Sequence, residues 1–209
     1  MINVKIFLGV LTVFLFLGKA EAADTLWLYF NQTPYDSGGT FSQAVFVDSL
    51  IIPEGNSGAS WPLVSFVITN NVELDSIKSF SLVFPFDTAG IKMTLDDFKI
   101  LKNSGGSPVY DQSFEAQSLG SSCNNTLLGD GWRGQGIAGG SICLSIAGGQ
   151  FRYLEATMNN RVMITKEFVT PVNWMGYDKL EFTYSIQRPG VAALKQSSFA
   201  EIKKIYKPD

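Results

Sequence analysis

The feature that most constrains this fold is the alternation of apolar and polar side chains along many short segments. In SFSLVFPF (79–86), three phenylalanines and a leucine occupy every second position. In KLEFTYSI (179–186), leucine, phenylalanine, tyrosine and isoleucine alternate with polar residues in the same way. Successive side chains of a strand point to opposite faces, so this spacing predicts strands with one buried face.

The same pattern, or an enrichment in β-branched and aromatic residues, predicts strands along most of the chain. The predicted strands are 25–30, 44–52, 63–69, 77–86, 98–102, 141–147, 152–158, 161–169 and 179–186. Segments rich in Gly, Asn, Pro and Ser separate them, and Asn159-Asn160 between two alternating runs predicts a tight hairpin. No helical period lies between these strands. The sequence therefore predicts an all-β fold, a two-sheet antiparallel β-sandwich of the jelly-roll type, as one domain over 23–190.

The first 22 residues have the pattern of a signal peptide. Lys5 precedes a 13-residue apolar run (6–18), and Ala20-Glu21-Ala22 provides the small-x-small cleavage pattern. The apolar run is shorter than the roughly 20 residues that span a bilayer. We expect cleavage after Ala22 and a secreted or periplasmic protein without stable membrane insertion; a retained anchor is the alternative.

Charge and composition narrow the classes of function. Removing Lys5, Lys19 and Glu21 leaves 16 − 2 = 14 basic and 19 − 1 = 18 acidic side chains, a formal charge of −4. A mildly acidic chain without a basic cluster is a poor nucleic-acid binder. The chain has no histidine, which excludes Ser-His-Asp catalysis, Cys-His catalysis and imidazole metal sites. We expect no cofactor, no metal site and no catalytic residues.

The only two cysteines, Cys123 and Cys143, bracket a glycine-rich segment that contains GQGIAG (134–139). This matches the G-x-G-x-x-G dinucleotide pattern, but a strand is predicted after it where the fingerprint requires a helix. A cofactor loop is therefore rejected. In an exported chain the two cysteines are expected to form a disulfide, which stabilises a loop of this length by roughly 3 kcal/mol.

The C-terminal segment 191–209 has a different pattern. Ser198 and Glu201 form a capping box, and Phe199, Ile202 and Ile205 fall on one helical stripe. We expect a short C-terminal helix, which either closes the end of the sandwich or serves as a docking or sorting tail.

Residues 45–98 resemble the opening half of a bacterial cohesin-type domain. FVITNN (66–71), FSLVF (80–84) and FDTAG (86–90) follow one another in the order of that family's strands and turn. The resemblance implies a nine-stranded jelly roll that recognises a protein partner or, in related carbohydrate-binding modules, a polysaccharide. The cysteine-bracketed loop and the C-terminal helix depart from the family pattern.

Loop aromatics are the candidate binding residues. Trp132, Trp174 and Tyr177 lie beside glycines in predicted loops, and Arg133 adjoins the first of them. Exposed rings there would stack on sugars or anchor a protein. Trp27 and Trp61 lie in or next to apolar runs and are expected in the core.

Acidic residues offer two weaker alternatives. Asp75, Asp96 and Asp97 are candidates for a calcium site, although such a site needs six or more oxygen ligands. Glu155 and Glu181 lie on predicted strands and are the candidates for a two-carboxylate glycan-processing site. Solvated strand faces are the simpler interpretation of both sets.

Three hypotheses of function follow. The first is an exported, non-catalytic adhesion or scaffold module that binds a protein partner at the cell surface or in the envelope. The second is a carbohydrate-binding module that stacks sugars on the loop aromatics, and the third is a carboxylate-based glycan-processing enzyme.

Overall fold

The structure of the protein is a computed structural model, which describes residues 24–32, 44–52, 61–68, 74–85, 88–102 and 104–189. These residues form strands joined by turns and one short 3-10 helix. The elements are β1 (Asp24–Asn31), β2 (Ala44–Ile52), β3 (Leu63–Val67), β4 (Ile77–Phe84), β5 (Ile91–Leu101), β6 (Tyr110–Gln112), β7 (Gly120–Cys123), β8 (Leu127–Leu128), η1 (Gly129–Gly131), β9 (Trp132–Gly136), β10 (Ser141–Gly148), β11 (Arg152–Asn159), β12 (Val162–Val172) and β13 (Lys179–Gln187).

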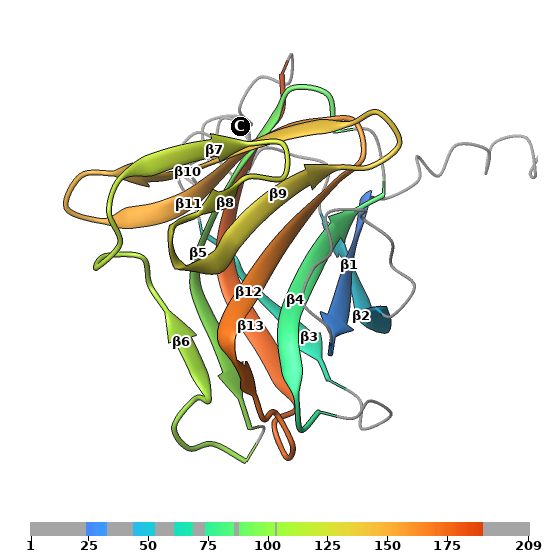
Figure 1. Ribbon diagram of the computed structural model, residues 1–209, viewed down its shortest axis with the longest axis vertical. Coiled ribbons are helices and arrows are strands. Elements are labelled where there is room, and N and C mark those ends of the chain that lie inside the picture. The colour runs from blue at the N-terminus through green and yellow to red at the C-terminus, as the bar shows by residue number, and fades with distance from the viewer. Residues whose placement is uncertain are drawn as a thin grey trace, which may run out of the picture.

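The strands form two antiparallel sheets that pack face to face, which confirms the predicted β-sandwich (Figure 1). The six-stranded sheet has the order β2-β1-β4-β12-β9-β8. The seven-stranded sheet has the order β3-β13-β5-β11-β10-β7, and β6 pairs with the second half of β5. In Figure 1, β4, β12 and β9 lie side by side in one layer.

Strand alternation decides what is buried. In β13 the inward set Leu180, Phe182, Tyr184 and Ile186 is buried, and the residues between them face outward. In β4, Phe80, Leu82 and Phe84 are fully buried, and the strand ends directly before Pro85, which cannot donate a ladder hydrogen bond.

Four short strands, β6 to β9, were not predicted. β8 and β9 lie in the glycine-rich segment, whose composition disfavours strands. Pairing with β12 makes β9 a strand nevertheless, and at Gly134 a Cβ would come within 2.9 Å of the Ile142 side chain. Glycine is therefore required for the close approach of β9 to β10.

The predicted hairpin at Asn159-Asn160 is wrong. β11 belongs to the seven-stranded sheet and β12 to the six-stranded one, so the turn between them crosses from one sheet to the other. The Thr88 hydroxyl donates a hydrogen bond to the backbone carbonyl of Asn160 at this crossing. Alternation on both sides of a turn does not reveal whether the two strands pair.

Cys123 and Cys143 form the predicted disulfide. They are directly opposite each other in the pairing of β7 with β10, on the outer face of the seven-stranded sheet. The bond closes the segment that contains β8, η1 and β9. It therefore fastens the edge strand β7 to the sheet.

Two expectations fall on residues outside the described part of the chain: the signal peptide (1–22) and the C-terminal helix (191–209). Within the described residues there is no helix with the length and apolar character needed to cross a bilayer.

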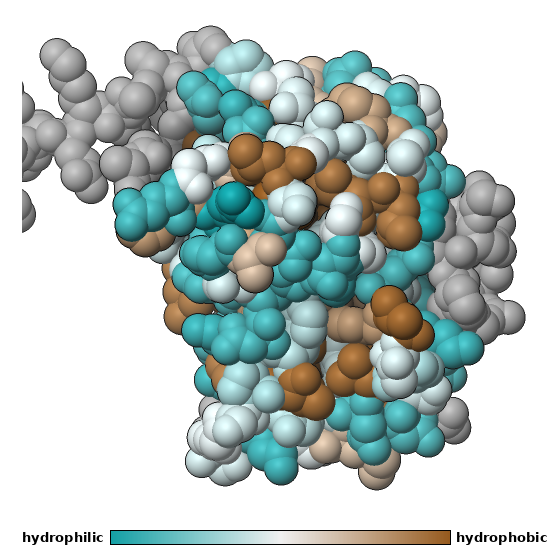
Figure 2. Space-filling model, turned by 60° about the vertical axis from the view of Figure 1, so that its left-hand side comes forward, coloured by the Kyte–Doolittle hydropathy of each residue, from teal (hydrophilic) through white to brown (hydrophobic). Residues whose placement is uncertain are grey.

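Hydrophobic patches on the face shown in Figure 2 are separated by hydrophilic surface.

Aromatic rings from both sheets meet in the core around Phe80. Its ring centroid lies 5.9 Å from Phe98, 5.9 Å from Trp132 and 6.1 Å from Trp174. Truncating a buried phenylalanine removes both its apolar burial and the contacts of its neighbours.

We predict that Phe80→Ala lowers the free energy of unfolding by about 3–5 kcal/mol. The matched control is Phe151→Ala, because Phe151 is 74% exposed and its truncation is expected to change stability by less than about 0.5 kcal/mol. Urea unfolding monitored by circular dichroism measures both. Equal effects of the two substitutions would contradict this account of the core.

For the disulfide, the double variant Cys123→Ser, Cys143→Ser is expected to lose about 3 kcal/mol of stability, because the unfolded chain regains the entropy of the open loop. Urea midpoints of the oxidised protein and the double variant give the difference. A loss below about 1 kcal/mol would show that the pairing of β7 and β10 does not need the covalent bond.

Candidate functional site

The prediction that Trp132 and Trp174 are exposed loop aromatics is wrong. Both rings are 0% exposed. Trp132 is the first residue of β9 and points inward, 4.9 Å from Phe98 between ring centroids. Trp174 follows β12 and meets Phe30 edge-on at 4.2 Å. Their large apolar rings fill the end of the sandwich, so in this structure neither is available to stack on a ligand.

Arg133 and Tyr177 do not join them on a common surface. The Arg133 Nε lies 2.9 Å from Glu167 Oε1, and its Nη1 donates to the Asn125 carbonyl at 2.6 Å. Tyr177 packs partly against the core with the Lys102 Nζ 5.1 Å from its ring centroid. Arg133 therefore holds the loop after β7, and the four predicted residues form no shared binding face.

A buried cation, Lys166, lies beside the aromatic cluster around Phe80. Lys166 points inward from β12 and is 4% exposed; its Nζ lies 3.1 Å from Asp130 Oδ2 and about 6 Å from the rings of Tyr110, Trp132 and Phe168. Burial lowers the pKa of the Lys166 ammonium, and the Asp130 carboxylate opposes that change. The ion pair and the ring faces compensate part of the cost of desolvating the charge.

Two tryptophans expected in the core are not buried there. Trp61 is 40% exposed and Trp27 is half-buried. Strand parity carries the signal for both. Trp61 shares its parity with the outward residues Leu63 and Ser65, and Trp27 lies between the inward residues of β1. The neighbouring apolar runs obscured this signal, because a run of hydrophobic residues looks buried whichever way each one points.

Trp61 forms one wall of a shallow groove on the outer face of the seven-stranded sheet. We call it the sheet-face groove; it has a volume of about 290 Å³. Its lining residues come from the segment before β3 and from β5, β11 and β13: Trp61, Lys92, Thr94, Tyr153, Glu155, Ser185 and Gln187.

Strand register positions these side chains. Ser185 of β13 pairs with Thr94 of β5, and Thr94 pairs with Glu155 of β11, so the three form one row across the sheet. The Trp61 and Tyr153 rings approach from either side, with centroids 5.7 Å apart and planes tilted by 57°. Thr94 and Ser185 contribute the shortest side chains of the lining.

The polar side of the groove carries a charge pair. Lys92 Nζ lies 2.7 Å from Glu155 Oε2, with the two side chains 45% and 18% exposed. The pair neutralises itself, so the groove presents hydrogen-bonding groups without a net charge. Gln187, opposite Lys92 in the register, adds an amide.

The structure does not bring Glu155 and Glu181 together. Glu181 is paired with Lys179, at 3.1 Å, and accepts a hydrogen bond from Ser65. It lies four residues along β13 from Ser185, which is in the row of Glu155. Four strand residues span about 13 Å, which exceeds the carboxylate separation of glycosidases.

The aspartates do not assemble a calcium site either. Within the described residues, no group of three or more Asp, Glu, Cys or His side chains is arranged to hold a metal ion. Asp96 faces outward on β5, and Asp97 occupies a positive-φ position (53°) at an irregularity in the pairing of β5 with β13. Burial raises the pKa of the Asp96 carboxyl to about 7, with smaller contributions from the charges of Asp97 and Glu115.

GQGIAG (134–139) covers the end of β9 and the turn toward β10. A strand therefore follows this turn, as predicted, where a dinucleotide fold would place a helix.

Comparison of the chain with protein-family models, with curated proteins and with solved structures finds no match.

The raised pKa of Asp96 predicts that the free energy of unfolding depends on pH. Its folded-state pKa of about 7 exceeds the unfolded value of about 3.9, so its contribution to folding is fully present below pH 4 and is lost as pH rises through 7. We expect Asp96→Asn to be more stable than the original protein at pH 8, by on the order of 1 kcal/mol because solvent screens this partly exposed group, and equally stable at pH 4.

Urea unfolding of both proteins at pH 4, 6 and 8 measures this difference. The asparagine oxygen retains an acceptor for the Asp97 N–H, which donates to Asp96 Oδ1 at 2.8 Å. A stability difference that does not change with pH would contradict the raised pKa.

Proposed function

We propose that the protein is an exported, non-catalytic glycan-binding β-sandwich that holds an uncharged sugar in the sheet-face groove. The observation that carries this proposal is the placement of Trp61 and Tyr153 beside a row of hydrogen-bonding side chains on a sheet face. Export is the expectation from residues 1–22, and the disulfide is compatible with an oxidising compartment.

The groove has the two kinds of surface that a sugar needs. A pyranose ring presents C–H groups on its faces, which pack on an aromatic ring, and hydroxyls at its edge, which need hydrogen-bond partners. Lys92 donates, Glu155 accepts, and Thr94 and Ser185 can do either. Hydrogen bonds to the charged pair are the stronger ones and would orient the ring.

The balance of charge favours a neutral glycan. An anionic sugar would compete with Glu155 for Lys92, and a cationic one would compete with Lys92 for Glu155. A hydroxyl-rich neutral ligand can bridge both partners without separating them. The shallow, open shape suits a stretch of a longer chain as well as its end.

The alternatives have less support. The burial of Trp132 and Trp174 removes the binding residues that were expected for a protein partner and for a sugar alike. The sheet-face groove replaces them with exposed rings beside hydrogen-bonding side chains, and this combination favours the sugar. Hydrolysis by two carboxylates would require both of them to face the substrate. Among the described residues that line the groove, Glu155 is the only carboxylate, and it is paired with Lys92 at 2.7 Å.

The test is binding to a panel of neutral oligosaccharides, followed by calorimetry on the best ligand. We expect Trp61→Ala and Tyr153→Ala each to weaken binding by about tenfold or more, because each ring supplies a stacking surface that alanine lacks. Glu155→Gln is expected to weaken binding through loss of the charged acceptor.

The matched control is Phe151→Ala, which removes another exposed ring two residues from Tyr153 but outside the groove. It is expected to bind like the unaltered protein. The proposal is wrong if no neutral glycan binds, or if Trp61→Ala and Phe151→Ala behave alike.

A further inference from the structure

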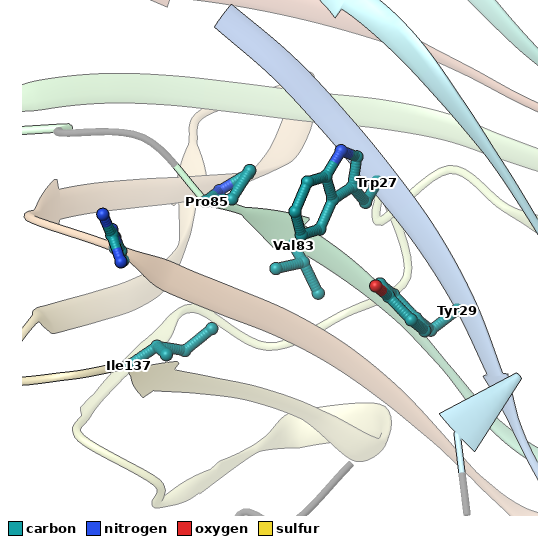
Figure 3. Close-up of a pocket in the computed structure, with 6 residues that line it drawn as sticks. Trp27, Tyr29, Val83, Pro85 and Ile137 are labelled. Carbon is teal, nitrogen blue, oxygen red and sulfur yellow. The ribbon is translucent and has the colours of Figure 1, made fainter. Parts of the chain in front are cut away.

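A second pocket lies on the opposite sheet and takes no part in the proposed glycan binding. We call it the β1–β4 pocket; it has a volume of about 450 Å³ and is lined by Trp27, Tyr29, Val83, Pro85, Ile137 and Arg161. Figure 3 shows Trp27 and Tyr29 projecting from β1 beside Val83, with Ile137 facing them from the turn after β9. Its size is in the range of pockets for small molecules.

The lining of this pocket is mainly apolar. Trp27 and Val83 are directly opposite each other in the pairing of β1 with β4, and Val83 is 4% exposed. The Trp27 and Tyr29 rings lie 6.5 Å apart at 64° to one another, so they form an angled wall. Pro85 extends the apolar surface past the end of β4.

One cation completes the lining. Arg161 is exposed, and among the described residues no carboxylate lies within ion-pair distance of it. Its backbone carbonyl accepts a hydrogen bond from the Ile137 N–H at 2.8 Å, which brings the two lining residues together. Gly140 allows this contact, since a Cβ there would lie 2.1 Å from the Arg161 oxygen.

We propose that the β1–β4 pocket binds a small amphipathic monocarboxylate. The apolar body of the ligand lies between Trp27, Val83 and Ile137, and its carboxylate pairs with the Arg161 guanidinium. The planar guanidinium matches a carboxylate in a two-bond geometry that a neutral ligand cannot use.

The lining argues against a sugar at this site. Apart from Arg161, the polar side-chain groups on the pocket are the Tyr29 hydroxyl and the Trp27 indole N–H. Partial burial raises the pKa of the Tyr29 hydroxyl, as expected for a group beside an apolar lining. A hydroxyl-rich ligand would leave most of its hydrogen-bonding groups facing apolar side chains.

The pocket is independent of the sheet-face groove. The two sites use different sheets and share no residue. Binding here can therefore succeed or fail whatever happens in the glycan assays.

The test uses octanoate as the probe, with 1-octanol as its neutral counterpart, and measures affinity by calorimetry and location by nuclear magnetic resonance. We expect octanoate to bind at one site and to shift the Trp27 indole signal. Arg161→Gln is expected to weaken octanoate binding by about tenfold or more through loss of the charge-assisted contact, while Arg161→Lys retains part of the affinity.

The matched control is Lys99→Gln, which removes one positive charge from the opposite sheet, away from the pocket. It is expected to bind octanoate like the unaltered protein. Since Arg161 is exposed, its substitution is not expected to unfold the chain.

Three results would overturn the proposal. Octanol binding as tightly as octanoate would show that the charge is not recognised. Equal loss of affinity in Arg161→Gln and Lys99→Gln would indicate general attraction by net charge. Binding of galacturonate in an Arg161-dependent manner, without binding of octanoate, would assign the pocket to an acidic sugar.

Discussion

The structure depends on one constraint: each sheet buries every second side chain against the other sheet. The two inner faces meet in the aromatic cluster around Phe80 of β4. Its members are Phe98 of β5, Trp132 of β9 and Trp174 in the loop after β12. A shift of one residue in any paired strand would exchange its inner and outer faces. The same parity that fills the core therefore decides which residues can reach a ligand.

Both candidate sites follow from that parity. The outward row of Glu155, Thr94 and Ser185 belongs to strands whose other faces are fully committed to the core. Trp27 and Val83 stand outward on the opposite sheet for the same reason. Sites on paired strands are held rigidly, because moving a lining residue would disturb the packing behind it. This rigidity favours recognition over movement.

Some segments of this fold were predictable from the sequence and others were not. Strands such as β4 and β13 were evident because their alternation is uninterrupted, and the disulfide was predicted from the two cysteines and the signal-peptide pattern of the sequence. β9 was missed because three of its five residues contribute little strand preference, and only pairing with β12 makes it extended. The candidate binding residues were mostly misplaced. Glycine neighbours made Trp132 and Trp174 look like exposed loop residues, but Trp132 begins β9, and Trp174 is fully buried although it lies in the loop after β12. Nearby hydrophobic residues made Trp61 look buried.

By itself, the sequence determined the all-β class, the main strands, the absence of histidine chemistry and the one pair of sulfurs able to bond, since each of these depends on local pattern or on composition alone. The tertiary structure decided which strands share a sheet, which tryptophans are covered and which polar groups meet. Those outcomes depend on contacts between residues far apart in the chain: Trp61 and Tyr153 are 92 positions apart, yet their rings lie 5.7 Å from one another. Local alternation indicates which side chains of a strand point away from the core. Only the assembled sheets determine which other residues those outward side chains contact.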